Sequence, residues 1–388
     1  MTGRSVLQVT LWSGPYLGNF MASELTFARA VRSRFGLGTH FVLGHGAQEQ
    51  PWLDSLESAG ATWSVLPAGR LGWRAHLKRA AEESDAALVH THFSAADIQA
   101  ATVASAAGVP CIWHIRTGFN GYPLTQRTKD LVKMRIVARR QVDRIITVSP
   151  WLAELARRRG APPDRIDVLP NPVVVDRFER LPDRMTARER FGLRPEATVI
   201  LALGWWPEVK GVDVLVDALG QISDDHPEVE ALLVGEEQMR SFLAHRLPEQ
   251  PPWLRTSAFV DDAACLFAAA DIFVSASRHE GQSSAIGEAL ACGLPVVMSD
   301  IAGTAGWGGA PCISTFPSED SAALAMRLEP LLAETPVGRR QAGAANGPWV
   351  ASHHGPEPWC DRLCGIYGQL LSAAERSAIP SAGAAQRA

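Results

Sequence analysis

Short apolar runs alternate with longer amphipathic stretches along the first half of the chain. The runs are rich in β-branched residues and predict strands at Ser5–Leu11, His40–Gly44, Thr62–Leu66, Ala87–His90, Cys111–Ile115, Arg144–Val148 and Ile166–Leu169. The stretches between them predict helices that include Phe20–Arg34, Ala95–Ala107, Thr125–Arg140 and Pro150–Arg159. Because the strands are apolar on both sides and are separated by helices, the pattern indicates an α/β fold with a parallel sheet covered on both faces.

The same alternation starts again after a polar passage that runs from Pro170 to Arg190. Further strands are predicted at Thr198–Gly204, Val229–Gly235, Ile272–Ala276, Leu294–Ser299 and Cys312–Ser314, with helices near Val212–Ile222, Asp261–Ala269, Ser284–Cys292 and Ser318–Leu332. We therefore expect two doubly wound, Rossmann-like domains, at residues 1–180 and 181–355, which suits a length of 388 residues. Ligands of such sheets bind beyond the carboxyl ends of the strands, so two of these domains facing one another would form a binding cleft. The Ala- and Ser-rich tail, residues 374–388, is expected to be disordered.

The segment from Ser277 to Val297 carries the most informative chemistry. A predicted strand ends in a tight loop at Glu280, and a helix follows that Gly293 terminates. Glu288 then lies in an otherwise apolar helix, where a partly buried carboxylate needs hydrogen-bond donors. Sugar hydroxyl groups are such donors, and free N–H groups at the helix start can meet phosphate oxygens. The spacing alone equally allows a structural role, with Glu280 as a helix cap and Glu288 paired with an arginine.

The wider sequence adds a family resemblance. Glu280-x7-Glu288, followed by Ala-Leu-Ala-Cys-Gly-Leu-Pro-Val-Val, resembles the signature of the retaining glycosyltransferases of family 4, which have the GT-B fold. Weaker motifs follow in the family's order, and they are Asp85-x4-His90–Thr91–His92, Gly108–Val109–Pro110, His114–Ile115, Val148–Ser149, Val168–Leu169–Pro170–Asn171–Pro172–Val173, Gly204-x5-Lys210–Gly211–Val212–Asp213, Leu233–Val234–Gly235, Phe259–Val260–Asp261 and Ala269–Ala270–Asp271–Ile272–Phe273–Val274. The resemblance covers nearly the whole chain. It implies that a final helix, at residues 356–373, crosses back toward the first domain.

The resemblance also implies roles for individual residues. Glu280 would hold hydroxyl groups of the donor sugar, Glu288 would hold the ribose, and Lys210 would neutralise the diphosphate. His114 would contact the sugar from the first domain, although a core histidine bonded to the backbone is the alternative. Other residues expected at the donor site are Gly18, Asn19, Gly204, Trp205, Gly235, Gly281, Gln282, Ser283 and Ser284. Tyr16 and Arg116 are the candidates for contacts to the acceptor.

Three positions depart from the family's pattern. Gly18–Asn19 stands where members have adjacent glycines, and asparagine tolerates the positive φ that such a turn needs. Trp205 replaces an arginine that contacts the diphosphate, so Arg278 or Arg116 would have to supply the second cation, or the donor site is weaker. Trp205 could instead stack on a sugar face or a nucleobase. The stretch after Asp300 lacks a glutamate that is often found there.

Charge is divided unevenly along the chain. Residues 1–180 carry 22 Lys and Arg against 15 Asp and Glu, whereas residues 181–388 carry 15 against 26. Much of the basic excess lies in 127–140 and 157–159, so the first domain could attract an anionic acceptor or make weak peripheral contact with a membrane. Solvated helix faces account for the same pattern.

Other features narrow the class of protein. The six cysteines show no disulfide spacing, and Met1–Leu11 has no features of a signal peptide, so we expect a cytoplasmic protein. His90 with His92 lacks a third ligand, and Cys360 with Cys364 lacks the spacing of a zinc knuckle, so no metal site is expected. No motif for nucleic-acid binding is present. The sequence leaves the oligomeric state open.

The resemblance implies an enzyme without cofactor or obligatory metal. It would move a hexosyl-type sugar from a nucleotide-diphosphate sugar to a hydroxyl group with the anomeric configuration retained. A small secondary metabolite is the favoured acceptor, and a lipid-linked or polysaccharide acceptor stays open. The alternatives are a non-hydrolysing sugar-nucleotide epimerase, which shares the fold, and a catalytically degenerate GT-B subunit that only binds.

Overall fold

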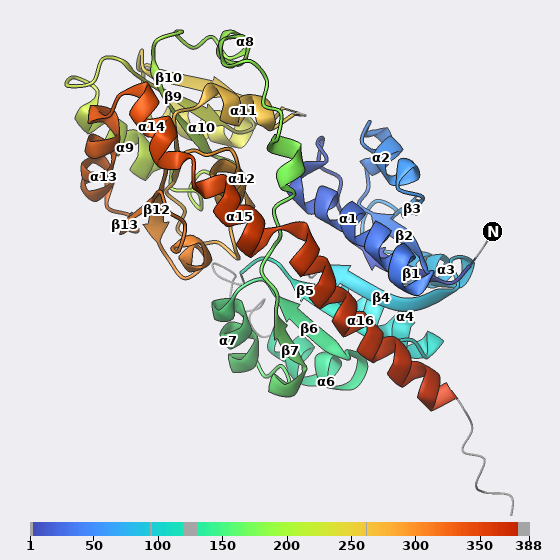
Figure 1. The fold of residues 1–388 in the computed structure, drawn as a ribbon. Coiled ribbons are helices and arrows are strands. Elements are labelled where there is room, and N and C mark those ends of the chain that lie inside the picture. The colour runs from blue at the N-terminus through green and yellow to red at the C-terminus, as the bar shows by residue number, and fades with distance from the viewer. Residues whose placement is uncertain (1–2, 94, 119–129, 261, 379–388) are drawn as a thin grey trace, which may run out of the picture. The chain divides into compact units, whose positions relative to one another are not determined.

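The computed structural model describes residues 3–93, 95–118, 130–260 and 262–378, and the chain in it divides into two compact units (Figure 1). Unit 1 comprises Met1–Gly14, Glu24–Leu169 and Glu357–Ala388, and unit 2 comprises Pro15–Ser23 and Pro170–Pro356. The C-terminal helix therefore belongs to the same unit as the first strand. Disorder was expected for residues 374–388, but 374–378 continue the C-terminal helix, which runs from Pro356 to Ala378, and the rest of this tail lies outside the described residues.

Unit 1 is built on a sheet of seven parallel strands in the order β3-β2-β1-β4-β5-β6-β7. The strands are β1 (Ser5–Val9), β2 (Gly38–Leu43), β3 (Thr62–Val65), β4 (Ala86–His92), β5 (Cys111–Ile115), β6 (Arg144–Thr147) and β7 (Ile166–Val168). All seven predicted strands are confirmed, with their ends moved by a residue or two.

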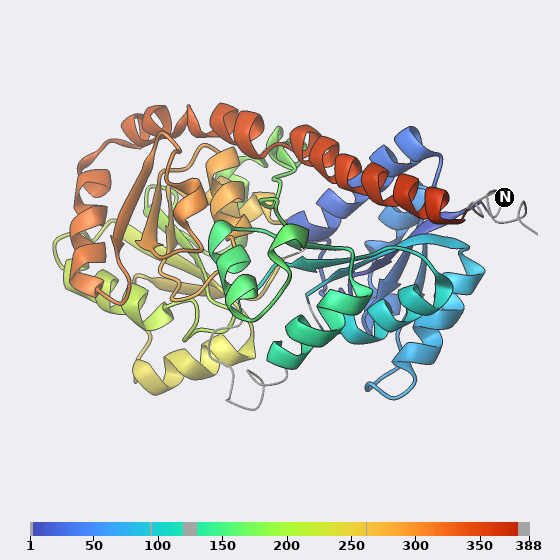
Figure 2. The same ribbon diagram turned by 90° about the horizontal axis from the view of Figure 1, so that it is seen from below.

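Helices cover both faces of this sheet. One face packs against α1 (Gly18–Phe35) and α16 (Pro356–Ala378), which lies lengthwise along it in Figures 1 and 2. The other face packs against α3 (Trp73–Glu83), α4 (Asp97–Ala107), the π-helix η2 (Lys133–Val137), α6 (Ala138–Gln141) and α7 (Pro150–Arg158). Successive strand residues point to opposite faces, so Val6 packs with α16 and Leu7 packs with α4. The remaining short helices are η1 (Ala47–Glu49), α2 (Leu53–Ser58) and η3 (Pro163–Arg165).

Unit 2 is built on six parallel strands in the order β10-β9-β8-β11-β12-β13. They are β8 (Thr198–Leu203), β9 (Val229–Val234), β10 (Leu254–Ser257), β11 (Ile272–Ser275), β12 (Val296–Asp300) and β13 (Ile313–Pro317). Sequence patterning missed β10, whose residues are Leu-Arg-Thr-Ser. This strand lies at the sheet edge and pairs only with β9, so it needs little apolar surface.

The helices of unit 2 again form two layers. One contains α8 (Arg184–Arg190), α11 (Ala264–Ala269), α12 (Ser284–Ala291) and α15 (Asn346–His354), and the other contains α9 (Val212–Ile222), α10 (Glu237–Arg246) and α13 (Ser321–Ala333). The shorter elements are η4 (Val175–Phe178), η5 (Ala305–Trp307) and α14 (Pro336–Gly343). Helix α8 lies in the polar passage before β8, for which the sequence pattern predicted no helix. Its N-cap Asp183 accepts a bond from the Thr186 backbone at 2.9 Å, and its buried Arg188 pairs with Asp271 at 2.7 Å.

Both sheets reverse their winding at one point. In unit 1 the reversal lies between β1 and β4, and in unit 2 it lies between β8 and β11. Loops at the carboxyl ends of such strand pairs diverge and leave room for a ligand. The loops after β8 and β11 therefore leave room for a ligand in unit 2.

Candidate functional site

Lys210 and Glu280 meet at the reversal point of unit 2. Lys210 lies in the loop after β8 and Glu280 lies in the loop after β11, and Nζ of the lysine donates to Oε1 of the glutamate at 2.6 Å. Ser277 donates to the same carboxylate oxygen at 2.9 Å. Only 10% of the Lys210 side chain and 12% of the Glu280 side chain are exposed, so the ion pair is weakly screened by water. Two predicted site residues that are far apart in sequence thus lie together.

Aromatic rings flank this ion pair. The Lys210 ammonium lies 4.5 Å from the centre of the Trp205 ring, a cation–π distance. Phe259 packs against Trp205 at 5.5 Å between ring centres, and Tyr16 packs against Phe259 at 5.4 Å. Burial, with a smaller contribution from the charge of Glu288, raises the pKa of Tyr16 to about 12, so its hydroxyl keeps its proton. Trp205 stands where the family's pattern has an arginine. It supplies no second cation, but its ring contacts the ammonium of Lys210.

Glycines allow the loops of the site to pass close to one another. Gly211 has a φ of 63°, and a Cβ there would collide with the carbonyl oxygen of Ala276. A Cβ on Gly303 would collide with the carbonyl oxygen of Glu280 and lie 2.7 Å from its Cβ. Gly211 follows Lys210 directly, so these two positions hold the backbones that carry the ion pair.

Gly204 and Gly235 directly follow the neighbouring strands β8 and β9, and neither position has room for a side chain. A Cβ on either would come within 2.7 Å of the sulfur of Met239, at 2.6 Å for Gly204 and 2.7 Å for Gly235. Met239 is fully buried in α10. The two glycines therefore let this helix approach the ends of β8 and β9.

Glu288 lies in α12 and pairs with Arg177 of η4, at 2.9 Å between Oε1 and Nη1. Its side chain is 11% exposed, and burial raises the pKa of the carboxyl above its ordinary value while Arg177 lowers it. Arg177 was not predicted, because its partner lies 111 residues away and no local pattern marks it. Pairing with an arginine was the structural alternative for Glu288, and in the structure Glu288 does pair with Arg177.

The segment between Glu280 and α12 connects the site to the chain that enters unit 2. Gln282 is buried, and its side-chain oxygen accepts a bond from the backbone of Asn171. Ser283 takes the N-cap position of α12 without a capping bond from its side chain. The first N–H groups of α12, near Ser284 and beside Gly281, are thus not capped by Ser283.

Asn19 anchors the first turn of α1. Its side-chain nitrogen donates to the carbonyl of Pro172 at 2.7 Å, and its side-chain oxygen accepts from the backbone of Val174 at 3.0 Å. Gly18 before it has a φ of 63°, whereas Asn19 itself lies within α1 and does not take the positive φ expected for it. Asn19 is buried and both ends of its amide are bonded, so it ties the first turn of α1 to the segment 172–174.

Arg278 is committed elsewhere. Its guanidinium binds both carboxylate oxygens of Asp213, at 2.9 and 2.7 Å, and also Glu319 at 2.7 Å. These partners raise its pKa well above the usual range. Supplying the second cation of the site would therefore require Arg278 to leave two acids.

In unit 1 the predicted residues His114 and Arg116 lie at the end of β5. Both are buried, and Arg116 pairs with Glu24 at 2.6 Å. Burial lowers the pKa of Arg116 to about 10 and raises that of Glu24 to about 7. His114 contacts His90 and His92 of β4, with ring centres 5.4 and 5.3 Å away.

The three histidines form a cluster that the sequence pattern did not reveal. His114 is the third histidine that was missing beside His90 and His92. One nitrogen from each lies within 4.8 Å of the others, which is close enough for a metal to be considered. Arg116 can only donate, and it reaches Nδ1 of His92 at 3.1 Å and Nδ1 of His114 at 3.4 Å. Both rings then carry their proton on Nε2, and a protonated nitrogen cannot bind a metal. Hydrogen-bond direction thus fits neutral donor histidines better than ligands.

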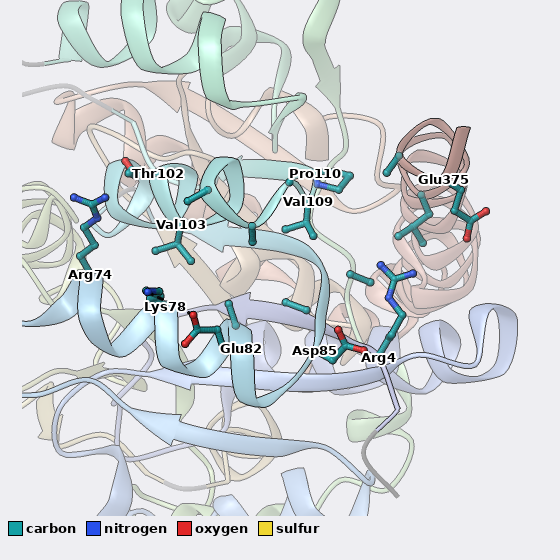
Figure 3. A pocket seen from close by; sticks show the side chains of 18 residues that line it. Arg4, Arg74, Lys78, Glu82, Asp85, Thr102, Val103, Val109, Pro110 and Glu375 are labelled. Carbon is teal, nitrogen blue, oxygen red and sulfur yellow. Dashed lines mark ion pairs between the residues drawn. The ribbon is translucent and has the colours of Figure 1, made fainter. Parts of the chain in front are cut away.

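A cavity of about 480 Å³ lies at the opposite, amino edge of the unit 1 sheet (Figure 3). Its lining includes Arg4, Arg74, Lys78, Glu82 and Glu375 around an apolar floor. Lys78 and Glu82 pair with each other at 3.6 Å. The cavity is remote in the fold from the strand ends that carry His114 and Arg116.

Two sequence profiles match the chain, largely one on each unit. Residues 39–177 match the profile described as Glycosyltransferase Family 4, and residues 197–334 match that described as Glycosyl transferases group 1. Among the described residues, no helix is long and apolar enough to cross a membrane.

Curated relatives are similar over part of their length. The chain is 34% identical over 189 residues to the D-inositol 3-phosphate glycosyltransferase 2 of Catenulispora acidiphila, which covers 44% of each protein. It is 27% identical over 226 residues to the UDP-Gal:alpha-D-GlcNAc-diphosphoundecaprenol alpha-1,3-galactosyltransferase of Escherichia coli, which covers 56% of this chain and 58% of that one. The chain thus spans about half the length of these relatives.

Solved structures share the fold. Anabaena HepE in complex with UDP-glucose has a TM-score of 0.79 and 19% identity, over 95% of this chain and all of that one. The sucrose-phosphate synthase of Thermosynechococcus elongatus has a TM-score of 0.72 and 18% identity, over 95% of this chain and 100% of that one. Likeness at this identity establishes the architecture alone, which is GT-B.

Proposed function

Because the chain belongs to glycosyltransferase family 4, we propose that it transfers a hexosyl-type sugar from a nucleotide-diphosphate sugar to a hydroxyl group, with the anomeric configuration retained. The observation that carries the proposal is the pair of Lys210 and Glu280 at the reversal point of the unit 2 sheet, 2.6 Å apart and nearly closed to water.

Lys210 stabilises the leaving group in this proposal. The diphosphate gains charge as the bond to the sugar breaks, and a fixed cation in a poorly hydrated site stabilises that charge more than water does. Glu280 and the face of Trp205 hold the ammonium before the donor arrives. Little reorganisation is then needed at the moment of reaction.

Glu280 and Glu288 orient the donor. A carboxylate has about four acceptor positions, so an acid that already pairs with a cation can still accept bonds from hydroxyl groups. Glu280 would take hydroxyls of the sugar, and Glu288, held by Arg177, would take the ribose. The leaving phosphate would accept the proton of the attacking hydroxyl on the same face of the sugar, so no protein nucleophile and no metal enter the reaction.

The test replaces the two central residues. Lys210→Ala and Glu280→Ala are each expected to lower kcat at least about a hundredfold, the scale of losing one preorganised charge contact. Glu237→Ala is the matched control, because Glu237 is an exposed acid of the same unit. Wild-type turnover in either site variant would remove the site assignment. Inversion at the anomeric carbon, read by NMR, would remove the retaining mechanism.

The same assay separates the alternatives. Incubating each nucleotide sugar alone reveals an epimer if the protein is an isomerase. Calorimetric binding of a donor without turnover on any acceptor would identify a binding subunit. The names of the two relatives suggest two classes of acceptor, a phosphorylated cyclitol and a lipid-linked sugar. Both classes should therefore be tested as acceptors in the transfer assay.

A further inference from the structure

The loop that joins β8 to α9 carries an exposed tryptophan. Trp206 is 60% exposed, and it is the only aromatic residue among the large apolar side chains that are strongly exposed in the described parts of the chain. Its indole forms no hydrogen bond and no ring contact with a described residue. The ring of its neighbour Trp205 packs against Phe259 and the ammonium of Lys210. The loop thus packs one indole inward and displays the next.

The backbone at Trp206 is strained. Its φ is 54°, a value that glycine adopts easily and that a bulky residue rarely adopts. Leu11 and Phe93 share this feature in unit 1, with φ values of 53° and 60°. The three residues lie just beyond β1, β4 and β8, which are strands at the points where the two sheets reverse their winding. Backbone strain gathers at ligand sites, and its place here indicates that Trp206 serves a substrate.

Hydrogen bonds hold this loop firmly. The carbonyl of Trp206 accepts from the backbone N–H of Lys210 at 3.0 Å, and the carbonyl of Val209 accepts from the backbone N–H of Arg278 at 2.8 Å. The guanidinium of Arg278 also donates to the carbonyl of Glu208 at 2.6 Å. Arg278 therefore braces the turn, and the indole is displayed in a fixed place beside the lysine of the proposed donor site.

Trp206 lies outside the buried part of the donor site. Only 10% of the Lys210 side chain and 12% of the Glu280 side chain are exposed, in contrast to the exposed indole. The indole is also not needed to hold the ammonium of Lys210, because the ring of Trp205 contacts that ammonium. When a donor occupies the ion pair, the outer indole is thus available to the second substrate, the acceptor.

The face of an indole selects a ring that has an apolar side. Its π electrons give the face a partial negative charge, which attracts the weakly positive hydrogens of C–H bonds. A pyranose or a cyclitol has such C–H bonds on its faces, and stacking removes this apolar area from water. The hydroxyl groups at the edge of the ring stay free for polar partners. A saturated, polyhydroxylated ring therefore fits the chemistry of Trp206.

We propose that Trp206 is a stacking platform for a saturated, polyhydroxylated ring of the acceptor, and that it helps to determine which acceptors bind. The inference rests on the proposed function, because it names an acceptor contact of the same reaction. It also gives a reason for the strained backbone. The positive φ lowers stability, but it displays the indole at the surface while Trp205 stays packed against Lys210.

Transfer kinetics test the proposal, with a phosphorylated cyclitol or a lipid-linked sugar as the acceptor. Trp206→Ala is expected to raise the KM for the acceptor about tenfold, the scale of one aromatic contact, and to leave the calorimetric Kd of the nucleotide sugar unchanged. Trp206→Phe keeps a ring and should bring this KM back to within about threefold of wild type. Met326→Ala is the matched control, because Met326 is 67% exposed on α13 and should change neither constant. An unchanged KM in Trp206→Ala, or weaker donor binding, would overturn the proposal.

Unfolding temperatures test the role of the strain. Trp206→Ala and Trp206→Gly both remove the indole, but only alanine keeps a Cβ at the positive φ. The glycine variant is therefore expected to unfold about 2–4 °C above the alanine variant, although glycine usually destabilises a chain relative to alanine. A glycine variant that unfolds at or below the temperature of the alanine variant would overturn the inference that strain is kept to display the ring.

A binding measurement separates this proposal from the proposed function. Protein labelled with 5-fluorotryptophan gives a fluorine NMR signal for Trp206, which is identified by its absence from Trp206→Phe. Methyl pyranosides of glucose, galactose and mannose are titrated without a donor, and we expect the Trp206 signal to move to saturation with at least one of them. Absence of transfer with this movement retained would contradict the proposed function alone. No movement with any of the three sugars would overturn the stacking platform.

Discussion

Removing Arg177 tests how unit 2 supports a buried acid. Arg177→Ala leaves Glu288 without its partner at 2.9 Å, in a helix where only 11% of the glutamate side chain reaches solvent. Breaking a fully buried ion pair costs about 3–5 kcal/mol. Arg177 is itself 21% exposed, so we expect the lower end, about 3 kcal/mol at pH 8.

The cost should depend on pH in a defined direction. Burial already raises the pKa of Glu288, and losing Arg177 raises it further. The unpaired carboxyl can then escape part of the penalty by taking up a proton in the folded state. The variant is therefore expected to lose less stability at pH 5 than at pH 8, because the folded form binds the proton more tightly than the unfolded chain does.

Scanning calorimetry measures this prediction. For a unit of this size, about 3 kcal/mol corresponds to a fall in unfolding temperature of roughly 6–12 °C. Arg240→Ala is the control, because Arg240 pairs with Glu237 on the exposed surface of the same unit and should leave the temperature unchanged. A loss below 1 kcal/mol at pH 8, or a larger loss at pH 5 than at pH 8, would refute the reasoning.

Three further predictions follow from the site and its surroundings. Trp205→Arg adds a cation beside Lys210 and is expected to lower the Kd for a nucleoside diphosphate about tenfold in calorimetry; unchanged or weaker binding would count against a diphosphate at this position. Gly303→Ala forces a methyl group onto the backbone of Glu280 and should abolish transfer, whereas Gly220→Ala, in a helix with open space around it, should keep full activity and raise the unfolding temperature. Because burial raises the pKa of Glu24 to about 7, its contribution to stability is greatest below pH of about 4.5 and is lost as the pH rises toward 7; Glu24→Gln should flatten that part of the pH profile in urea unfolding.

The alternation of apolar runs and amphipathic stretches was enough to predict both sheets, because buried parallel strands need side chains that are apolar on each face. It failed where burial was not the cause of the structure. Strand β10 lies at a sheet edge, and α8 is held by the ion pair of Arg188 with Asp271 across 83 residues. Neither element has a local repeat of apolar residues from which it could be predicted.

The types of residue at the candidate site were also legible in the sequence, since Glu280, Glu288 and Lys210 stand at predicted strand ends and on a predicted helix. What only the tertiary structure decided is which charges meet. Lys210 pairs with Glu280 because β8 and β11 are neighbours in the sheet. Glu288 pairs with Arg177, which no sequence motif identifies. The local sequence shows which positions are buried, because buried residues recur with the period of a strand or a helix. The pairing of charges depends on strand order and on distances that arise only when remote segments pack.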